Sequence, residues 1–185
     1  MITKPMESVC VYCGSRHGDD IAFTHEARAL GKGLAAMGVR LVYGAGDVGL
    51  MGEVARAALS AGGKAVGVIP RHILELEVGL RDLTALILTD TMHERKKIMF
   101  ANADAVVALP GGAGTLDELV EVLTWRQLGL HAKPLILMNA GGYWDPFLAL
   151  IDHVIAKGFA AESLRHFITV AADAAETLAL LAEHR

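Results

Sequence analysis

The sequence lacks the marks of membrane, secreted and nucleic-acid-binding proteins. No apolar run is long enough to cross a bilayer as a helix, because glycine or a charged residue interrupts each one. The first 15 residues contain no apolar leader segment, so we expect a cytoplasmic protein. The 17 Lys and Arg residues fall short of the 21 Asp and Glu residues, and the resulting net charge of −4 argues against a nucleic-acid partner.

Cysteine and metal-binding patterns are scarce as well. The two cysteines, Cys10 and Cys13, form the pattern CVYC, which in redox proteins opens a helix. Here residues 8–13 read as a buried strand, in which positions i and i+3 face opposite sides, so we predict two buried thiols without a disulfide. The histidines show no metal-ligand spacing, and Lys97 stands where an HExxH zinc motif needs histidine. We therefore expect neither a metal nor a cofactor.

What the sequence does contain is a regular alternation of strand-like and helix-like segments. Continuous apolar runs, typical of a parallel sheet covered on both faces, are separated by amphipathic segments that end in glycine. There is no linker, repeat or low-complexity tract, so this order predicts one α/β domain over residues 1–185, with a doubly wound parallel sheet of about seven strands between two helical layers. The strands are expected at residues 8–13, 40–45, 64–69, 85–89, 105–110, 134–139 and 167–171.

Ligands of such sheets bind beyond the carboxyl ends of the strands, and four segments there have unusual compositions. They are YCGSRHGDD, YGAGDVGLMG, TDTMHERKK and PGGAGTLDE. The GAGDVG stretch, residues 44–49, has the spacing of a dinucleotide-binding turn. The acidic residue that would bind ribose hydroxyls about 20 positions later is absent, although Arg71 is compatible with a 2′-phosphate. An NADP enzyme therefore stays open as an alternative, as does a purely structural role for these glycines in a tight turn.

A second glycine-rich loop, LPGGAGTLDE, lies at residues 109–118. Pro110 gives an extended exit from the strand, and three glycines let a ligand approach the backbone N–H groups. Thr115 is a predicted N-cap that forms a capping box with Glu118. A cap alone does not need three glycines, so we predict a phosphate site at the start of this helix. The loop lacks the lysine of a nucleoside-triphosphate site, which indicates a single phosphate group.

A predicted helix in TMHERKKIMF carries Met92, Arg95, Lys96 and Met99 on one face. Arginine supplies a bidentate fork for phosphate or carboxylate, and lysine supplies a point charge. This face is therefore either a solvated basic stripe or part of the ligand site. Its place at the carboxyl end of a strand, one strand before the glycine-rich loop, favours the ligand site.

With these motifs, the sequence resembles the Lonely Guy family of cytokinin-activating phosphoribohydrolases, which are often misnamed lysine decarboxylases. The resemblance runs from about Val9 to Phe167. The family signature PGGxGTxxE is complete at residues 110–118, MHERK at residues 92–96 matches an MHxRK pattern, and CVYCGS matches the first strand and loop. Where the family loop is commonly GGGxxGLMG, Ala45 replaces a glycine, and we expect its methyl group to fill space near the ligand.

The resemblance implies a Rossmann-like fold and hydrolysis of the N-glycosidic bond of an adenosine 5′-monophosphate derivative, with a free base and ribose 5-phosphate as products. It implies Glu118 and Arg95 as the catalytic residues. We expect Glu118 to be ionised, because the helix dipole and nearby cations favour its charged form, and Arg95 to orient Glu118 or the ribose. The residues implied for binding the substrate and its phosphate are Ser15, Gly44, Gly46, Glu77, Met92, Lys96, Gly111, Gly112, Ala113, Gly114, Thr115 and Thr124.

The helix after the glycine-rich loop also bears on assembly. Its expected core residues are Leu116, Leu119, Val120 and Leu123, with Val122 and Trp125 on another face. Exposed apolar side chains there indicate self-association, and the family resemblance implies a homodimer.

Two alternative functions stay open. The first is a broader nucleosidase for nucleoside 5′-monophosphates, with AMP as a main substrate, because the sequence does not define the base pocket. The second is a non-catalytic carrier of a nucleotide or cofactor, against which the presence of both Glu118 and Arg95 argues. The lysine decarboxylase name finds no support, because no lysine lies in a pattern typical of a pyridoxal Schiff base.

Overall fold

The strands form one parallel sheet. The computed structural model describes residues 5–74 and 82–184, and its strands are ordered β4-β3-β2-β1-β5-β6-β7. All seven predicted strands are confirmed, but several end one or two residues early, where the chain turns into the loops of the functional site. Their bounds are β1 Ser8–Tyr12, β2 Arg40–Tyr43, β3 Ala65–Pro70, β4 Ala85–Thr89, β5 Ala105–Ala108, β6 Leu135–Met138 and β7 Thr169–Ala171.

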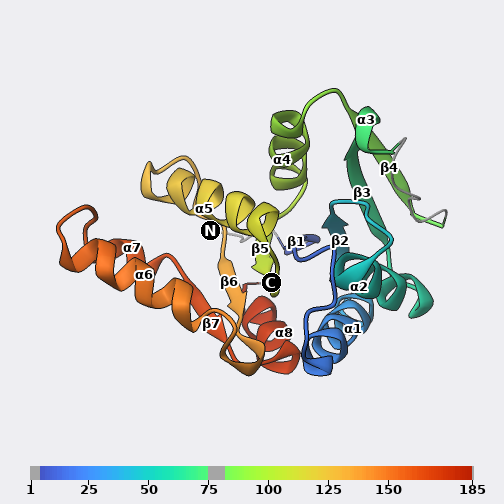
Figure 1. The fold of residues 1–185 in the computed structure, drawn as a ribbon. Coiled ribbons are helices and arrows are strands. Elements are labelled where there is room, and N and C mark those ends of the chain that lie inside the picture. The colour runs from blue at the N-terminus through green and yellow to red at the C-terminus, as the bar shows by residue number, and fades with distance from the viewer. Residues whose placement is uncertain (1–4, 75–81, 185) are drawn as a thin grey trace.

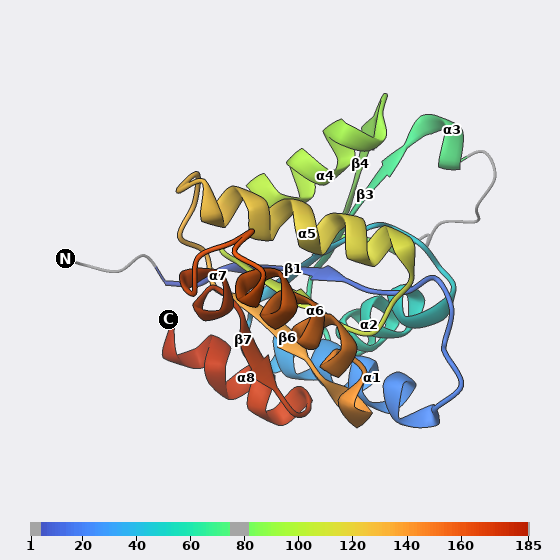
Figure 2. The same cartoon turned by 60° about the vertical axis from the view of Figure 1, so that its left-hand side comes forward.

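Helices cover both faces of this sheet and give the predicted three layers (Figure 1). Figure 2 shows α4 and α5 above β1, and α1, α2 and α8 below it. No helix in the described ranges has the length and apolarity needed to span a bilayer. The helix bounds are α1 Ile21–Ala36, α2 Gly49–Ser60, α3 Arg71–Leu74, α4 Met92–Ala101, α5 Ala113–Gln127, η1 Ala140–Gly142, α6 Asp145–Ala156, α7 Ser163–His166 and α8 Ala174–Glu183.

Each face of the sheet has its own apolar core, because successive side chains of a strand point to opposite faces. On β1, Val9 and Val11 pack with α1, α2 and α8, whereas Cys10 and Tyr12 pack with α4, α5 and α6. Cys13 lies on the same side as Val9 and Val11. Both thiols are buried and unpaired, which confirms the prediction made from the CVYC pattern.

Helix α5 begins earlier than predicted. Its N-cap is Gly112 rather than Thr115, and no described side chain caps it. Thr115 is instead a buried residue of the first turn, so the predicted capping box with Glu118 is wrong. The bare glycine backbone allows helical geometry from Ala113 onward, which carries Thr115 inward.

The face of α5 that packs on the sheet also differs from the prediction. Leu119 and Leu123 are buried as expected, and Val122 is buried with them. Leu116 and Val120, which were expected in the core, are 38% and 46% exposed. The hydrophobic pattern alone did not fix the rotation of this helix, because apolar residues occur on more than one of its faces.

Trp125 is not a free surface residue. Its ring packs edge-on against Phe100 of α4, with 5.1 Å between the ring centroids. An exposed apolar strip nevertheless runs along α5 and the residues just after it, and we call it the α5 strip: Leu116, Val120, Leu128 and Leu130.

The strand order locates the ligand crevice. From β1 the chain builds outward through β2, β3 and β4 on one side, then returns to pair β5 with β1 and builds outward on the other. The loops after β1 and β5 therefore diverge to opposite faces of the sheet. Doubly wound sheets bind their ligands at the carboxyl ends of the strands at such a point.

Candidate functional site

A cavity of about 560 Å³ opens at the carboxyl ends of β1, β2 and β5. All four segments singled out in the sequence contribute to its wall. They supply the loop after β1, Gly44 with the start of α2, one face of α4, and the glycine-rich loop with the start of α5. The structure thus brings together segments that are up to about a hundred residues apart in the chain, as the sheet topology predicts.

The loops around the cavity hold one another through the backbone. The Gly14 N–H donates to the Pro110 carbonyl at 3.0 Å, and the Met51 N–H donates to the Gly14 carbonyl at 3.3 Å. Gly49 has a φ of +59° and lies so close to the backbone of Ser15 that a Cβ there would be 2.2 Å from the Ser15 carbonyl carbon. Only glycine fits this contact, so the loops after β1 and β2 form one joined wall.

The glycine-rich loop presents bare backbone to the cavity. The first helical hydrogen bond of α5 runs from the Leu116 N–H to the Gly112 carbonyl at 3.0 Å. The N–H groups of Ala113, Gly114 and Thr115 therefore precede it and have no acceptor within the helix. These residues line the cavity, and the positive end of the helix dipole points the same way. This arrangement suits a phosphate group.

Gly111 is required for packing rather than for ligand access. A Cβ at this position would lie 2.1 Å from the Thr115 hydroxyl oxygen and 2.8 Å from the Gly14 nitrogen. A side chain here would therefore push the glycine-rich loop away from the loop after β1 and from the first turn of α5. By contrast, Gly112 and Gly114 have open space where a Cβ would stand, which leaves room for a ligand.

Tyr143 is a wall residue that the sequence analysis missed. Its hydroxyl donates to the Gly111 carbonyl at 2.5 Å and thereby fixes a peptide unit of the glycine-rich loop. Its ring packs edge-on against Phe23 of α1, another missed wall residue, with 5.7 Å between centroids. A signal for Tyr143 was present, because the GGYW segment follows β6, whose carboxyl end lies at the same edge of the sheet.

Arg95 reaches the cavity from α4 and is held by backbone carbonyls. Its Nη2 donates to the Gly44 carbonyl at 2.9 Å, and its Nε donates to the Val68 carbonyl at 3.1 Å. A Cβ at Gly44 would be 1.9 Å from Nη2, so the glycine makes room for the guanidinium. Of the two expected roles, a direct contact of Arg95 with Glu118 is not formed, because Glu118 has no hydrogen bond or ion pair with any described residue. A contact of Arg95 with the ribose stays a prediction.

Glu118 is partly buried in the wall of the cavity, one turn into α5. Burial raises the pKa of its carboxyl group from 4.5 to about 7. Arg95 and Lys96 lower this pKa, while Asp117 and Glu121 raise it further. The cations do favour the charged form of Glu118, as expected, but the loss of solvation outweighs them and raises the pKa above its ordinary value. Near neutral pH, Glu118 is able both to accept and to donate a proton.

Lys96 was expected to bind the phosphate, but it is not among the described residues that line the cavity. Its side chain is 8% exposed, and its ammonium group lies 2.9 Å from an Asp117 oxygen and 3.3 Å from a Glu121 oxygen. The lysine thus forms ion pairs with two acidic side chains of α5 and joins this helix to α4. Of the four residues predicted to share one face of α4, Met92, Arg95 and Met99 line the cavity.

The remaining predicted site residues either line the cavity, lie elsewhere in the structure, or fall outside the described residues. Ser15 and Gly44 line the cavity, whereas Gly46 is not among its described wall residues and lies against Met51. Thr124 is exposed on α5 and donates its hydroxyl to the Val120 carbonyl at 2.8 Å. Glu77 lies outside the residues that the structure describes.

Ala45 does not fill space near the ligand. It is fully buried, and its methyl group points at Gly67 of β3, where a Cβ would be 2.7 Å from the Ala45 Cβ. The expectation of a methyl group beside the ligand is therefore wrong. The residue packs behind the cavity wall, because the turn directs its side chain toward β3.

The described wall thus combines three chemical groups in one cavity. The start of α5 offers N–H donors for an anion, Arg95 offers a fixed guanidinium, and Glu118 offers a carboxyl group with a pKa near neutrality. A carboxyl group with such a pKa is suited to general acid–base chemistry at physiological pH. The cavity has the size of a small-molecule site.

Comparison with known proteins identifies a family model and relatives that this chain matches. A family model described as "Possible lysine decarboxylase" matches residues 51–181. The cytokinin riboside 5′-monophosphate phosphoribohydrolase LOG of Oryza sativa subsp. japonica is 46% identical over 176 residues, which cover 95% of this chain and 73% of the relative. The LOG1 enzyme of Arabidopsis thaliana, with the same activity in its name, is 38% identical over 99% of this chain and 86% of the relative.

Solved structures with the same fold include cofactor-binding proteins. The molybdenum cofactor carrier protein of Chlamydomonas reinhardtii superimposes with a TM-score of 0.73 at 25% identity, over 96% of this chain and 97% of that one. The molybdenum cofactor binding protein of Rippkaea orientalis gives a TM-score of 0.71 at 22% identity, over 99% and 98%. The second of these likenesses is one of fold alone.

Proposed function

The chain belongs to the Lonely Guy (LOG) family of cytokinin riboside 5′-monophosphate phosphoribohydrolases, and from this premise we propose that it hydrolyses the N-glycosidic bond of adenosine 5′-monophosphate and its N6-substituted derivatives. The products are the free base, a cytokinin or adenine, and ribose 5-phosphate. No cofactor takes part in the proposed reaction. The whole chain acts as one nucleotide-binding domain.

One observation carries this proposal: the N–H groups at the start of α5 that have no acceptor within the helix and the carboxyl group of Glu118 line the same cavity, on successive turns of one helix. A 5′-phosphate bound to the N–H groups of Ala113, Gly114 and Thr115 directs the attached ribose toward Glu118. Binding energy from the unreacting phosphate then contributes to orienting the bond that breaks.

In the proposed mechanism, the ionised form of Glu118 accepts a proton from a water molecule that attacks the anomeric carbon of the ribose. The bond from this carbon to the base nitrogen breaks with the electron pair going to the base, which takes up a proton from the solvent, and Glu118 then releases its proton to the solvent. The carboxylate also stabilises the positive charge that develops on the sugar. Arg95 lowers the pKa of Glu118 and so favours the ionised form that the reaction uses.

The test is the substitution Glu118→Gln. We expect this variant to bind AMP, because the N–H groups of the loop are unchanged, and to lose turnover by on the order of 10² or more, because an amide accepts no proton. Released base is quantified by chromatography, and AMP binding by calorimetry. Glu183→Gln, at the exposed end of α8, is the matched control and should keep wild-type turnover. Near-normal turnover of Glu118→Gln would remove Glu118 from the mechanism.

The range of bases is tested separately. Purified protein is incubated with AMP, with other nucleoside monophosphates and with isopentenyladenosine monophosphate, and the released bases are compared. Preference for the isopentenyl nucleotide supports a cytokinin-activating enzyme, whereas equal rates across bases support a broad nucleosidase of nucleotide salvage.

A cofactor carrier is the second candidate function, favoured by the structural similarity to the molybdenum cofactor carrier protein. The carrier and the enzyme predict different results with AMP, because a carrier binds a nucleotide-like ligand and releases no base. Retention of bound AMP without any hydrolysis would support the carrier and contradict the enzyme. The presence of Glu118 and Arg95 together in the cavity supports the enzyme.

We also propose that the protein forms a homodimer. Support comes from the α5 strip, whose four apolar side chains are between 38% and 69% exposed, and from Leu86 and Leu88 on the edge strand β4. Exposed apolar side chains that cluster along a helix, as in the α5 strip, are typical of protein interfaces. Light scattering on the purified protein tests the proposal, and a monomer mass at micromolar concentration would contradict it. The cytoplasmic location stays a prediction from the sequence.

A further inference from the structure

The turn after β2 is held in a conformation that its sequence does not favour. Ala45 has a φ of +62°, and it is the one residue other than glycine with a positive φ among those the structure describes. The left-handed region disfavours residues with a Cβ, and such residues persist there only where the surroundings over-determine them. The fit of the Ala45 methyl group against Gly67 is one such contact.

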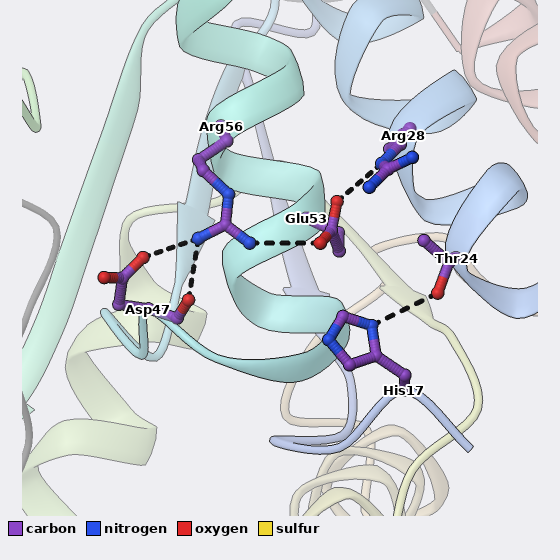
Figure 3. Close-up of polar contacts among 6 residues, drawn as sticks. All are labelled: His17, Thr24, Arg28, Asp47, Glu53 and Arg56. Atoms are coloured by element: carbon purple, nitrogen blue, oxygen red, sulfur yellow. Dashed lines mark hydrogen bonds and ion pairs between the residues drawn. The ribbon is translucent and has the colours of Figure 1, made fainter.

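Four charged side chains form a network that holds the turn at Asp47 (Figure 3). Arg56 of α2 donates from Nη1 to the Asp47 carbonyl at 2.7 Å and to the Asp47 carboxylate at 2.6 Å. Its Nη2 donates to Glu53 at 3.1 Å, and the other oxygen of Glu53 accepts from Arg28 of α1 at 2.6 Å. One arginine thus holds both the main chain and the side chain of Asp47 and is itself anchored to two helices.

The same turn carries the carbonyl that holds Arg95. Gly44, next to Ala45, accepts the 2.9 Å hydrogen bond from Arg95 Nη2. A change in the φ and ψ angles of residues 44–47 rotates this carbonyl and displaces the guanidinium from its place in the cavity. Arg28, Asp47, Glu53 and Arg56 are not among the described residues that line the cavity, so the network acts on Arg95 only through the turn.

We propose that Arg56, backed by Glu53 and Arg28, is a positioning residue that fixes Arg95 by clamping the strained turn of residues 44–47. This inference rests on the proposed function, in which Arg95 acts on Glu118 in the reaction. The phosphate site at the start of α5 lies on a different wall and makes no use of the clamp. Loss of the clamp therefore lowers turnover and leaves the binding of the nucleotide largely intact.

The experiment compares kcat and KM for base release from AMP in wild type, Arg56→Ala, Arg56→Lys, Ala45→Gly and the double variant Ala45→Gly/Arg56→Ala. We expect Arg56→Ala to lower kcat on the order of 10-fold with KM changed by less than about 2-fold, because displacement of a catalytic group costs rate rather than affinity. Arg56→Lys keeps the charge but offers a single donor nitrogen in place of the two that Arg56 uses, so this variant retains part of the turnover. The variants should remain folded, because Arg56 is 42% exposed and exposed ion pairs contribute little to stability.

The double variant separates positioning from ordinary stabilisation. Glycine adopts a positive φ without strain, so Ala45→Gly lowers the energy that the clamp has to supply, and the double variant should recover several-fold in kcat over Arg56→Ala. Arg165→Ala is the matched control, because it removes a surface pair with Asp152, 3.5 Å long and similarly exposed, between α6 and α7. This control should keep wild-type kcat.

Three outcomes would overturn the inference: wild-type kcat in Arg56→Ala, an equal loss in Arg165→Ala, or no recovery in the double variant. Crystal structures of wild type and Arg56→Ala provide a readout that does not depend on activity. They should show a rotated Gly44 carbonyl and a displaced Arg95 in the variant, and an unmoved Arg95 would refute the clamp. A wild-type protein that releases no base refutes the proposed function alone, because the crystallographic comparison still decides the positioning role.

Discussion

Replacement of Glu118 by glutamine should stabilise the protein at alkaline pH while it lowers turnover by on the order of 10² or more. Glu118 has a folded-state pKa of about 7, above its ordinary value of 4.5, because burial penalises the charged form. Below pH 4.5 the carboxyl group is protonated in both the folded and the unfolded chain, so it adds no penalty. Between pH 4.5 and about 7 the unfolded chain releases this proton while the folded chain keeps it, so stability is lost over that range. Above pH 7 both chains are ionised and the loss is complete. Glutamine has a similar shape and does not ionise, so the variant escapes this loss.

The magnitude follows from the pKa difference. A shift of one pKa unit corresponds to about 1.4 kcal/mol, so the rise from 4.5 to about 7 corresponds to at most about 3 kcal/mol at pH 8. For a chain of this length, 1 kcal/mol moves the melting temperature by about 2–4 °C. We therefore expect Glu118→Gln to melt about 6–12 °C above wild type at pH 8, and at nearly the same temperature as wild type at pH 4.5.

The assay is thermal unfolding followed by circular dichroism at several pH values between 4.5 and 8.5. The informative quantity is the difference in melting temperature between variant and wild type, which should grow as the pH rises. Glu183→Gln, at the exposed end of α8, should show no such growth. A difference for Glu118→Gln that is the same at pH 5 and pH 8 would refute the claim that burial raises the pKa of this carboxyl group.

Three further predictions concern catalysis. The kcat/KM for AMP should rise about tenfold between pH 6 and pH 8, because the ionised fraction of Glu118 increases as the pH passes its pKa of about 7. Initial rates measured across this pH range test the prediction. A flat profile would contradict the role of Glu118 as the base. Adenosine, which lacks the 5′-phosphate, should be hydrolysed with a kcat/KM lower by on the order of 10² or more, and rates equal to those of AMP would refute the phosphate anchor. Tyr143→Phe removes the hydrogen bond to the Gly111 carbonyl and should raise KM for AMP several-fold with little change in kcat. An unchanged KM would show that the glycine-rich loop keeps its shape without Tyr143.

Local sequence patterns were sufficient for the framework and for the position of the site. Continuous apolar runs located all seven strands. For the five inner strands the reason is burial on both faces, which admits almost no polar residue. The edge strands β4 and β7 are partly exposed, and they were found only because their residues are apolar as well. The glycine-rich loop was recognisable because bare backbone at a helix start has few other uses. Even so, the exact start of α5 was missed, since Thr115 satisfies the rules for an N-cap equally well.

Contacts between distant segments were beyond the reach of these patterns. Lys96 and Arg95 are adjacent on the helix that begins at Met92, yet one pairs with acidic residues of α5 and the other enters the cavity. Which of them faces the ligand depends on how α4 and α5 pack together. Tyr143 reaches the loop across 32 positions of the chain, and no local periodicity reports such a contact.

The amino-acid sequence by itself determined the parallel sheet, the loops at its carboxyl edge and the residue types available there. These follow from local physics: the burial of apolar runs, the φ range of glycine and the dipole at a helix start. The tertiary structure alone decided that the carboxyl group of Glu118 loses enough solvent to titrate near neutrality, and that a turn strained at Ala45 is clamped from two helices. Solvation and strain of this kind depend on every segment that packs around a group, so they exist only once the chain has folded.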